Sequence, residues 1–249
     1  MMKVYNTLWK AVLLCFLLCP LYAFAQTISK QTIDLQQIPH KKVRRYIADK
    51  EINKLENYSA IKSSWNDTID PTGFCTHEKI FYLNDEINHV WECYKVASPA
   101  KSWNGRFVKF ALLILKPTNS VVYTDCVNFS EIDTGQVYFL DLKLMKGLFN
   151  VPVAFEIIRV DADEKIIEFS YIDGNKSQGK QVLHFIDNGN GTTQISHLSY
   201  FKSNSGLRDT FFYPYYHTKI IRQFHRNMRE MVLSAAQNKN GASFLTLNF

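Results

Sequence analysis

The sequence predicts an α+β fold in which a curved antiparallel sheet packs against a long C-terminal helix, with an extra helical segment on the N-terminal side. Short turns that contain Asp-Gly or Asn-Gly separate the apolar segments of residues 166–201, and strands that return after so few residues pair antiparallel. Residues 217–231 carry apolar side chains at helical spacing. A second helical pattern follows Pro39, which suits a first helical turn. The composition, 46% hydrophobic and 21% charged, is that of a globular protein.

Residues 1–25 have the features of a secretory signal peptide. Two lysines precede an apolar run at residues 11–18, and the alanines within residues 23–25 supply the small side chains that signal peptidase requires. The apolar run is shorter than the about 20 residues that span a bilayer, which disfavours an anchor helix. We therefore expect cleavage before Gln26 and export to the periplasm or the medium.

The charge and the cysteines of the chain exclude some functions. The formal net charge is +6, and loss of the two lysines in the leader reduces it to +4. This excess is too small to indicate a nucleic-acid partner. Cys75, Cys93 and Cys126 remain after cleavage, so at most one internal disulfide can form, and their spacing matches no metal site.

Residues 26–73 are expected to form an N-terminal helical extension and a linker. Val43, Tyr46, Ile47, Ile52 and Leu55 recur at roughly helical spacing. The basic run at 40–45 would meet anionic lipid or nucleic acid, but such a run is more often the solvated face of a helix.

A strand is predicted at 75–83, followed directly by a helix at 84–96. Asn84 is a suitable N-cap, and two acids follow it in the first turn, where the helix dipole favours them. The apolar side chains of this helix, at 87, 90, 91 and 94, form one stripe. Residues 98–105 then break the pattern, with room for one further helical turn.

A long β region and a final helix complete the pattern. Strands are predicted at 106–116, 120–129, 135–145, 151–160, 166–172, 180–186 and 192–201. The last helix extends to about Ala236. One of its faces is apolar and carries His217, Ile221, Phe224, Met228 and Met231, whereas three arginines form another face.

Three stretches carry a family resemblance: EKIFYL leading into NDEINHVWECYKVASPAKSW, the turn-linked strands GKQVLHFIDNGNGTTQISHLSYF, and the helix YHTKIIRQFHRNMREMV. Their order resembles the helix-grip fold of the START-like superfamily, also called SRPBCC, which includes the major birch-pollen allergen group. The resemblance covers about residues 74–236 and leaves the extension at 26–73 and the tail at 237–249 outside. It implies a strongly curved sheet wrapped around the last helix, with an apolar cavity between them.

Catalytic and metal-binding motifs are missing from the sequence. It contains no His-Glu-x-x-His, Cys-x-x-Cys, Gly-x-Ser-x-Gly, P-loop or dinucleotide-binding glycine pattern. We therefore expect no metal and no cofactor. Histidines are the only candidates for acid–base chemistry, and no carboxylate is placed beside any of them by the sequence.

The sequence favours binding over catalysis, with a hydrophobic or amphipathic small molecule, lipid-like or aromatic, as the ligand. Its site would lie between the sheet and the C-terminal helix. The helix would supply an inner wall, and histidines and a tyrosine would supply polar contacts. The candidate ligand-binding residues are Tyr171, His197, His217, Ile221, Phe224 and Met228.

Two alternatives remain open at this point. One is an enzyme of the same fold that acts on an aromatic or polyketide-like substrate, with a histidine in the pocket as acid or base. The other is a protein-interaction module, in which the basic run and the helix before residue 63 bind a partner through an exposed apolar patch. We also expect a monomer without a nucleic-acid partner, and the basic run offers a peripheral contact with a membrane.

Overall fold

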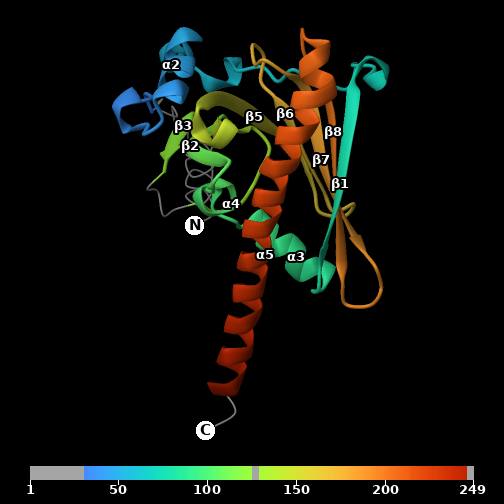
Figure 1. Cartoon of the computed structure of the whole chain (residues 1–249). Helices are drawn as coiled ribbons and strands as arrows, with labels where there is room; N and C mark the ends of the chain where they lie inside the picture. Colours follow the sequence, from blue (N-terminus) through green and yellow to red (C-terminus); the bar gives the residue numbers. More distant parts are fainter. Residues whose placement is uncertain (1–30, 125–128, 246–249) are drawn as a thin grey trace, which may run out of the picture.

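The computed structural model describes residues 31–124 and 129–245. The expected signal peptide therefore lies outside the described residues. Eight strands form one curved antiparallel sheet in the order β1-β8-β7-β6-β5-β4-β2-β3 (Figure 1). The strands are β1 (Cys75–Leu83), β2 (Val108–Leu115), β3 (Ser120–Tyr123), β4 (Gln136–Leu144), β5 (Phe149–Asp161), β6 (Ile166–Tyr171), β7 (Gln178–Asp187) and β8 (Thr193–Lys202).

Short turns account for the consecutive pairing of β5 through β8. Gly174 and Gly191, in the Asp-Gly and Asn-Gly turns, have φ angles of 79° and 71°, a region that glycine enters without the steric cost of a Cβ atom. The antiparallel sheet that these turns predicted is confirmed.

The long helix α5 (Tyr213–Leu245) lies across one face of the sheet, together with α3 (Ile87–Lys95) and α4 (Pro99–Trp103). A π-helical turn, η6 (Arg208–Phe212), leads directly into α5. The core on this face includes Met228 and the stacked rings of Trp103 and Phe224, whose centroids are 4.3 Å apart. The helix-grip arrangement predicted from the sequence is therefore present.

The N-terminal segment covers the opposite face of the sheet. It contains α2 (Lys41–Asp49) and the short 3₁₀ turns η1 (Leu35–Gln37), η2 (Ile52–Lys54), η3 (Tyr58–Ala60) and η4 (Pro71–Gly73). Val43 and Ile47 of α2 are fully buried and belong to one core with Leu112 of β2 and Phe139 of β4. The exposed apolar patch that the interaction-module alternative required on this helix is therefore not found.

Three local predictions differ from the structure. The helix expected to run through Leu55 ends at Asp49, because Glu51 has a φ of 55°, which is incompatible with α-helix. The helix expected from residue 84 begins at Ile87, and its N-cap is Glu86 instead of Asn84. The strand expected at 135–145 ends at Leu144, where the short η5 turn (Met145–Gly147) begins and separates β4 from β5.

None of the helices within residues 31–124 and 129–245 is long and apolar enough to cross a membrane.

Candidate functional site

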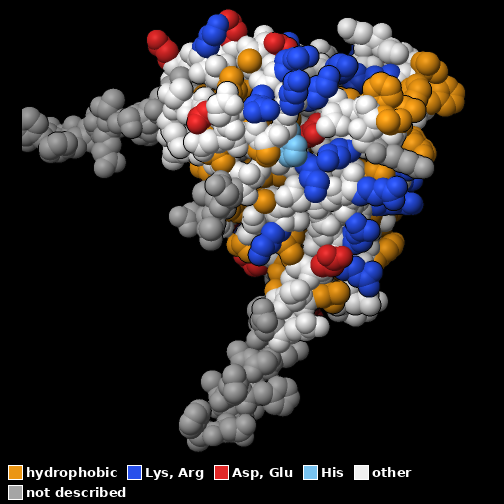
Figure 2. Space-filling view, turned by 60° about the vertical axis from the view of Figure 1, so that its left-hand side comes forward, with side chains coloured by type: hydrophobic (Ala, Val, Ile, Leu, Met, Phe, Trp, Pro, Cys, Tyr) orange, Lys and Arg blue, Asp and Glu red, His pale blue; other side chains and the backbone are white. Residues whose placement is uncertain are grey.

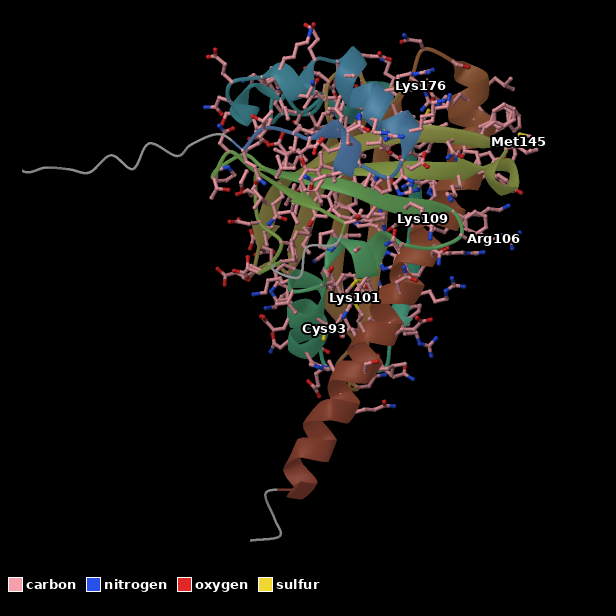
Figure 3. The ribbon with its side chains drawn as sticks, turned by 90° about the vertical axis from the view of Figure 1, so that its left-hand side faces the viewer. Cys93, Lys101, Arg106, Lys109, Met145 and Lys176 are labelled. Atoms are coloured by element: carbon pink, nitrogen blue, oxygen red, sulfur yellow. The ribbon has the colours of Figure 1, made fainter. Side chains whose placement is uncertain are left out.

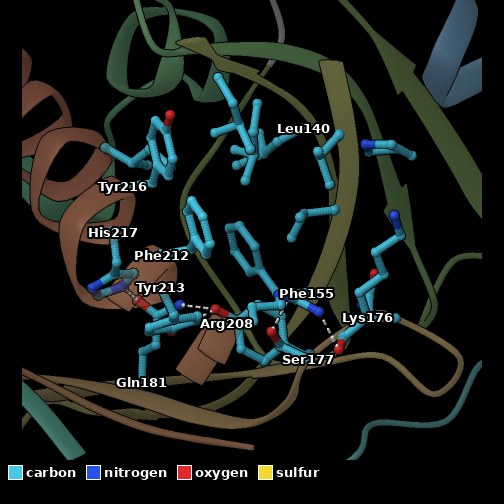
Figure 4. A pocket seen from close by; sticks show the side chains of 18 of the residues that line it. Leu140, Phe155, Lys176, Ser177, Gln181, Arg208, Phe212, Tyr213, Tyr216 and His217 are labelled. Atoms are coloured by element: carbon cyan, nitrogen blue, oxygen red, sulfur yellow. Dashed lines mark hydrogen bonds between the residues drawn. The ribbon is translucent and has the colours of Figure 1, made fainter. Parts of the chain in front are cut away.

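A cavity of about 430 Å³ lies between the sheet and the first turns of α5 (Figure 4). Strands β4 and β5 supply one wall, and η6 with the start of α5 supplies the other. Most of the surface is apolar, and representative side chains are Leu140, Leu142, Val153, Phe155, Ile220 and Ile221. The volume falls within the 300–1,000 Å³ range of small-molecule sites.

The cavity opens to solvent beside η6. Leu207 and Phe212 line the cavity, yet they are 63% and 52% exposed, so their side chains lie at its opening. Lys176, from the loop between β6 and β7, lines the same cavity and is exposed. A ligand can therefore reach the apolar interior past a rim that is partly hydrophobic and partly basic.

Hydrogen-bonding groups gather at one end of the cavity. The hydroxyl oxygens of Tyr171 and Tyr213 are 2.7 Å apart, and Gln181 Nε2 donates to the Tyr171 hydroxyl at 3.2 Å. His217 and Arg208 lie in the same part of the wall. The cavity is thus amphipathic, with one polar end and an apolar remainder.

Behind this polar end, four histidines form a continuous hydrogen-bonded network. Gln181 Oε1 lies 2.7 Å from His197 Nε2 and 2.8 Å from His217 Nε2. Further from the cavity, His197 Nδ1 is 2.9 Å from His225 Nε2, and His217 Nδ1 is 3.2 Å from His77 Nδ1. The network therefore connects β1, β7 and β8 to α5.

Hydroxyl groups terminate the network at both ends. The Tyr94 hydroxyl lies 2.9 Å from His225 Nδ1, and Thr218 Oγ1 lies 3.0 Å from His77 Nε2. A neutral imidazole has one donor and one acceptor nitrogen. Because the carbonyl oxygen of Gln181 only accepts, both Nε2 atoms donate to it, so that His197 Nδ1 accepts from His225 Nε2 and the Tyr94 hydroxyl donates to His225 Nδ1. On the other side the Thr218 hydroxyl, which contacts His77, also donates to the backbone oxygen of Pro214 at 2.7 Å. Every ring nitrogen of the four histidines thereby has a partner.

Burial keeps this network uncharged. Desolvation lowers the pKa of His197 and of His217 well below its usual value, and it lowers that of His225 to about 3. Desolvation also raises the pKa of Tyr171 to about 12 and that of Tyr213 well above 10. At neutral pH these residues offer hydrogen bonds and no charge.

The predicted site residues fall into three groups. Tyr171, His217 and Ile221 line the cavity. His197 lies one layer behind it and reaches it only through Gln181. Phe224 and Met228 lie further along α5, where the space beside them is only about 30 Å³. The stripe on α5 is therefore continuous, but the cavity occupies only its N-terminal part.

Several lining residues were not among the candidates. Gln181, Ser177 and Arg208 come from β7, from the preceding loop and from η6, where no pattern in the sequence distinguishes them from ordinary polar surface residues. Alternation along β7 offers a weak signal, because it places Gln181 on the same face as the buried Leu183 and Phe185.

No three His, Cys, Asp or Glu side chains in the described part of the chain are placed to hold a metal ion. The four histidines of the network lie close together, but their ring nitrogens are engaged in the hydrogen bonds described above. No aspartate or glutamate is among the residues that line the cavity.

No protein-family model and no curated protein matches the chain at a significant level. Among solved structures, norcoclaurine synthase from Thalictrum flavum, in complex with dopamine and hydroxybenzaldehyde, is 14% identical with a TM-score of 0.47, and the match covers 68% of this chain and 94% of that one. A protein from Thermus thermophilus is 10% identical with a TM-score of 0.46, covering 65% of this chain and 99% of the other. The architecture described above, an antiparallel sheet curved around a C-terminal helix, is an α+β helix-grip fold.

Proposed function

We propose that this protein binds an amphipathic small molecule in the cavity between its sheet and the start of α5. The observation that carries the proposal is the form of the cavity, which joins an apolar interior of about 430 Å³ to a single polar end. Burial of a hydrocarbon or ring system against Leu140, Phe155 and Ile221 would supply most of the binding free energy, at about 25 cal/mol per Å² of apolar surface. The polar end would fix the orientation of the ligand.

Binding is favoured over catalysis by the state of His217. One of its nitrogens contacts Gln181 and the other contacts His77, and its pKa is lowered by desolvation. To act as a base on a bound substrate, this imidazole would have to give up one of these hydrogen bonds. The alternative of an enzyme with a histidine as acid or base therefore has less support than a binding protein.

Export and a monomeric state form part of the same proposal. Export rests on the leader features of residues 1–25. If export occurs as proposed, protein recovered from outside the cytoplasm begins at Gln26, which N-terminal sequencing measures. An N-terminus at Met1 in that fraction would contradict cleavage.

We further propose that the protein takes up its ligand during peripheral contact with a membrane. Lys41 and Lys42 of α2 are exposed, and basic side chains lie across the surface seen in Figure 2. Met145 and Leu148, between β4 and β5, and Phe149, the first residue of β5, are 53%, 78% and 58% exposed, and Figure 3 shows Met145 at the outer edge of the molecule. Apolar side chains on a surface that is also basic suit the interface of an anionic bilayer.

The direct test of the binding function is identification of a bound molecule. Protein purified under native conditions is extracted with organic solvent, and the extract is analysed by mass spectrometry. We expect an amphipathic compound at a molar ratio near one. An empty extract, together with no displacement of a fluorescent long-chain probe by any amphiphile, would overturn the proposal.

The membrane contact has a separate test, which is flotation with vesicles. Binding to vesicles that contain anionic lipid should exceed binding to neutral ones and should fall in a Leu148→Asp, Phe149→Asp variant. Equal recovery of the variant and the wild type would exclude this surface.

A further inference from the structure

Arg208 is held in a fixed position at the polar end of the cavity. Its Nη1 donates to the backbone oxygen of Lys176 at 2.6 Å, and its Nη2 donates to Ser177 Oγ at 2.6 Å (Figure 4). Both acceptors belong to the loop between β6 and β7, whereas Arg208 begins η6. A guanidinium group carries five N–H donors, so three remain for another partner.

No carboxylate in the described part of the chain forms an ion pair with this guanidinium. Among the described residues, none of the ion pairs includes Arg208, Lys176 or Lys202. The carboxylate of Asp209, the next residue, accepts hydrogen bonds from the Ser203 backbone nitrogen and hydroxyl at 2.8 and 2.7 Å. It is thus engaged with the segment that follows β8.

A second hollow continues the cavity at this point. Its volume is about 290 Å³, and it shares Asn175, Lys176, Ser205 and Arg208 with the main cavity. Lys202 completes a set of three cationic side chains around it, and no acidic residue lines it. The polar end of the apolar cavity therefore leads into a space whose charged groups are all positive.

The two tyrosine hydroxyls lie within the influence of the same charge. Arg208 acts on both Tyr171 and Tyr213, where its positive charge opposes the effect of burial on their pKa. The two hydroxyls bond each other, which uses one of their two protons, so an anion beside Arg208 would find one phenol donor as well as the guanidinium. Charged hydrogen bonds of this kind are roughly twice as strong as neutral ones.

We propose that the ligand of this cavity carries an anionic headgroup, a carboxylate or a phosphate, that binds Arg208 while its apolar part occupies the main cavity. The inference rests on the proposed binding function and specifies the ligand class as an anionic amphiphile. Ser177 and the backbone at Lys176 pre-orient the guanidinium, and Lys176 and Lys202 add positive charge at the outer side.

The test compares three probes on the full mature chain: a saturated long-chain fatty acid, the primary alcohol of the same chain length, and inorganic phosphate. Affinities are measured by calorimetry for wild type, Arg208→Gln and Arg222→Gln. Arg222 is an exposed arginine on α5 and serves as the matched control. We expect the wild type to bind the acid on the order of tenfold or more tightly than the alcohol, as one charged hydrogen bond would give.

Arg208→Gln should reduce the affinity for the acid to that for the alcohol and leave the alcohol unchanged. Arg222→Gln should change neither. Phosphate at millimolar concentration should compete with the acid and not with the alcohol. The ratio of the affinity for the acid to that for the alcohol distinguishes a headgroup contact from a structural role, because a collapsed cavity would lower both affinities alike.

The remaining outcomes are separable. Equal affinity of the wild type for acid and alcohol would overturn the headgroup inference and leave the binding function intact. If neither amphiphile binds, the binding function itself fails. Arg208-dependent binding of phosphate without either amphiphile would mean a site for a free anion, which also overturns the inference. A parallel loss of acid and alcohol in Arg208→Gln would assign Arg208 a structural role only.

Discussion

His197 Nδ1 on β8 lies 2.9 Å from His225 Nε2 on α5, which joins the sheet to the helix that covers it. Both imidazoles are buried, and the pKa of each is lowered. This contact makes the packing of α5 on the sheet depend on the neutral state of both rings.

Stability should therefore fall in mild acid. In the unfolded chain His197, His217 and His225 bind protons below about pH 6.5, whereas in the folded state their pKa values are depressed. The stabilising contribution is fully present above pH 6.5 and is lost as the pH falls. The free energy of unfolding should drop by up to about 1.4 kcal/mol per pH unit for each histidine. Urea denaturation at a series of pH values between 7.5 and 5 measures this drop in the free energy of unfolding.

A single substitution measures the contribution of one histidine to this pH dependence. His225→Asn should lower the slope of stability against pH by about 1.4 kcal/mol per unit, whatever its effect at pH 7.5. The matched control is His184→Asn on β7, which lies outside the histidine network. An unchanged slope in His225→Asn would show that His225 is not held neutral.

Gln181→Leu should destabilise the protein by roughly 1–3 kcal/mol, because it leaves the Nε2 group of buried His197 without a partner. His217 Nε2 keeps its contact with Ser199 Oγ at 3.3 Å. Gln178→Leu, at the exposed start of the same strand, is the control and should cost little. Thermal and denaturant unfolding provide the measurement. Equal costs for the two variants would contradict the network.

The two parts of the α5 stripe should respond differently to substitution. Ile221→Phe adds volume inside the cavity and should weaken ligand binding by about tenfold or more with little loss of stability. Met228→Ala removes a fully buried side chain from filled core and should cost about 2–5 kcal/mol while leaving affinity nearly unchanged. Parallel probe-binding and unfolding measurements decide this, and the reverse pattern would place the ligand beside Met228.

Gly179→Ala should be strongly destabilising, because a Cβ at this position would lie 2.0 Å from the backbone oxygen of Tyr200 on the neighbouring strand. Gly189→Ala is a matched control, since its φ is also positive at 73° but nothing lies within 4 Å. The control should cost about 1–3 kcal/mol for backbone strain alone. A similar loss in both variants, by denaturant unfolding, would mean that the close strand contact is easily relieved.

Sequence patterns predicted the architecture well, because turn chemistry and periodicity act locally. The turns at Gly174 and Gly191 and the stripe on α5 sufficed for antiparallel strands gripping a helix. Alternation was less informative in β2, where an irregularity between Phe110 and Leu112 shifts the register, so that Phe110 and Leu113 face the same core.

The cavity could be predicted only in outline. Which turns of α5 touch a ligand depends on where the curvature of the sheet leaves room, and this is a property of the whole fold. Phe224 was placed in the cavity wall because it shares a stripe with Ile221, whereas in the structure the ring of Trp103 fills the space beside it. Arg208 and Gln181 gain their roles from residues far away in sequence.

The length of α5 has a practical consequence. Its 33 residues extend about 50 Å, whereas the ten residues of β7 cover about 33 Å, and its final turns project beyond the sheet in Figure 1. Exposed Ser234 lies about 20 Å along the helix axis from Ile221. A fluorophore attached through Ser234→Cys, with Cys75 and Cys93 replaced by serine, would sit within energy-transfer range of a labelled guest without obstructing it, so that occupancy can be followed in real time.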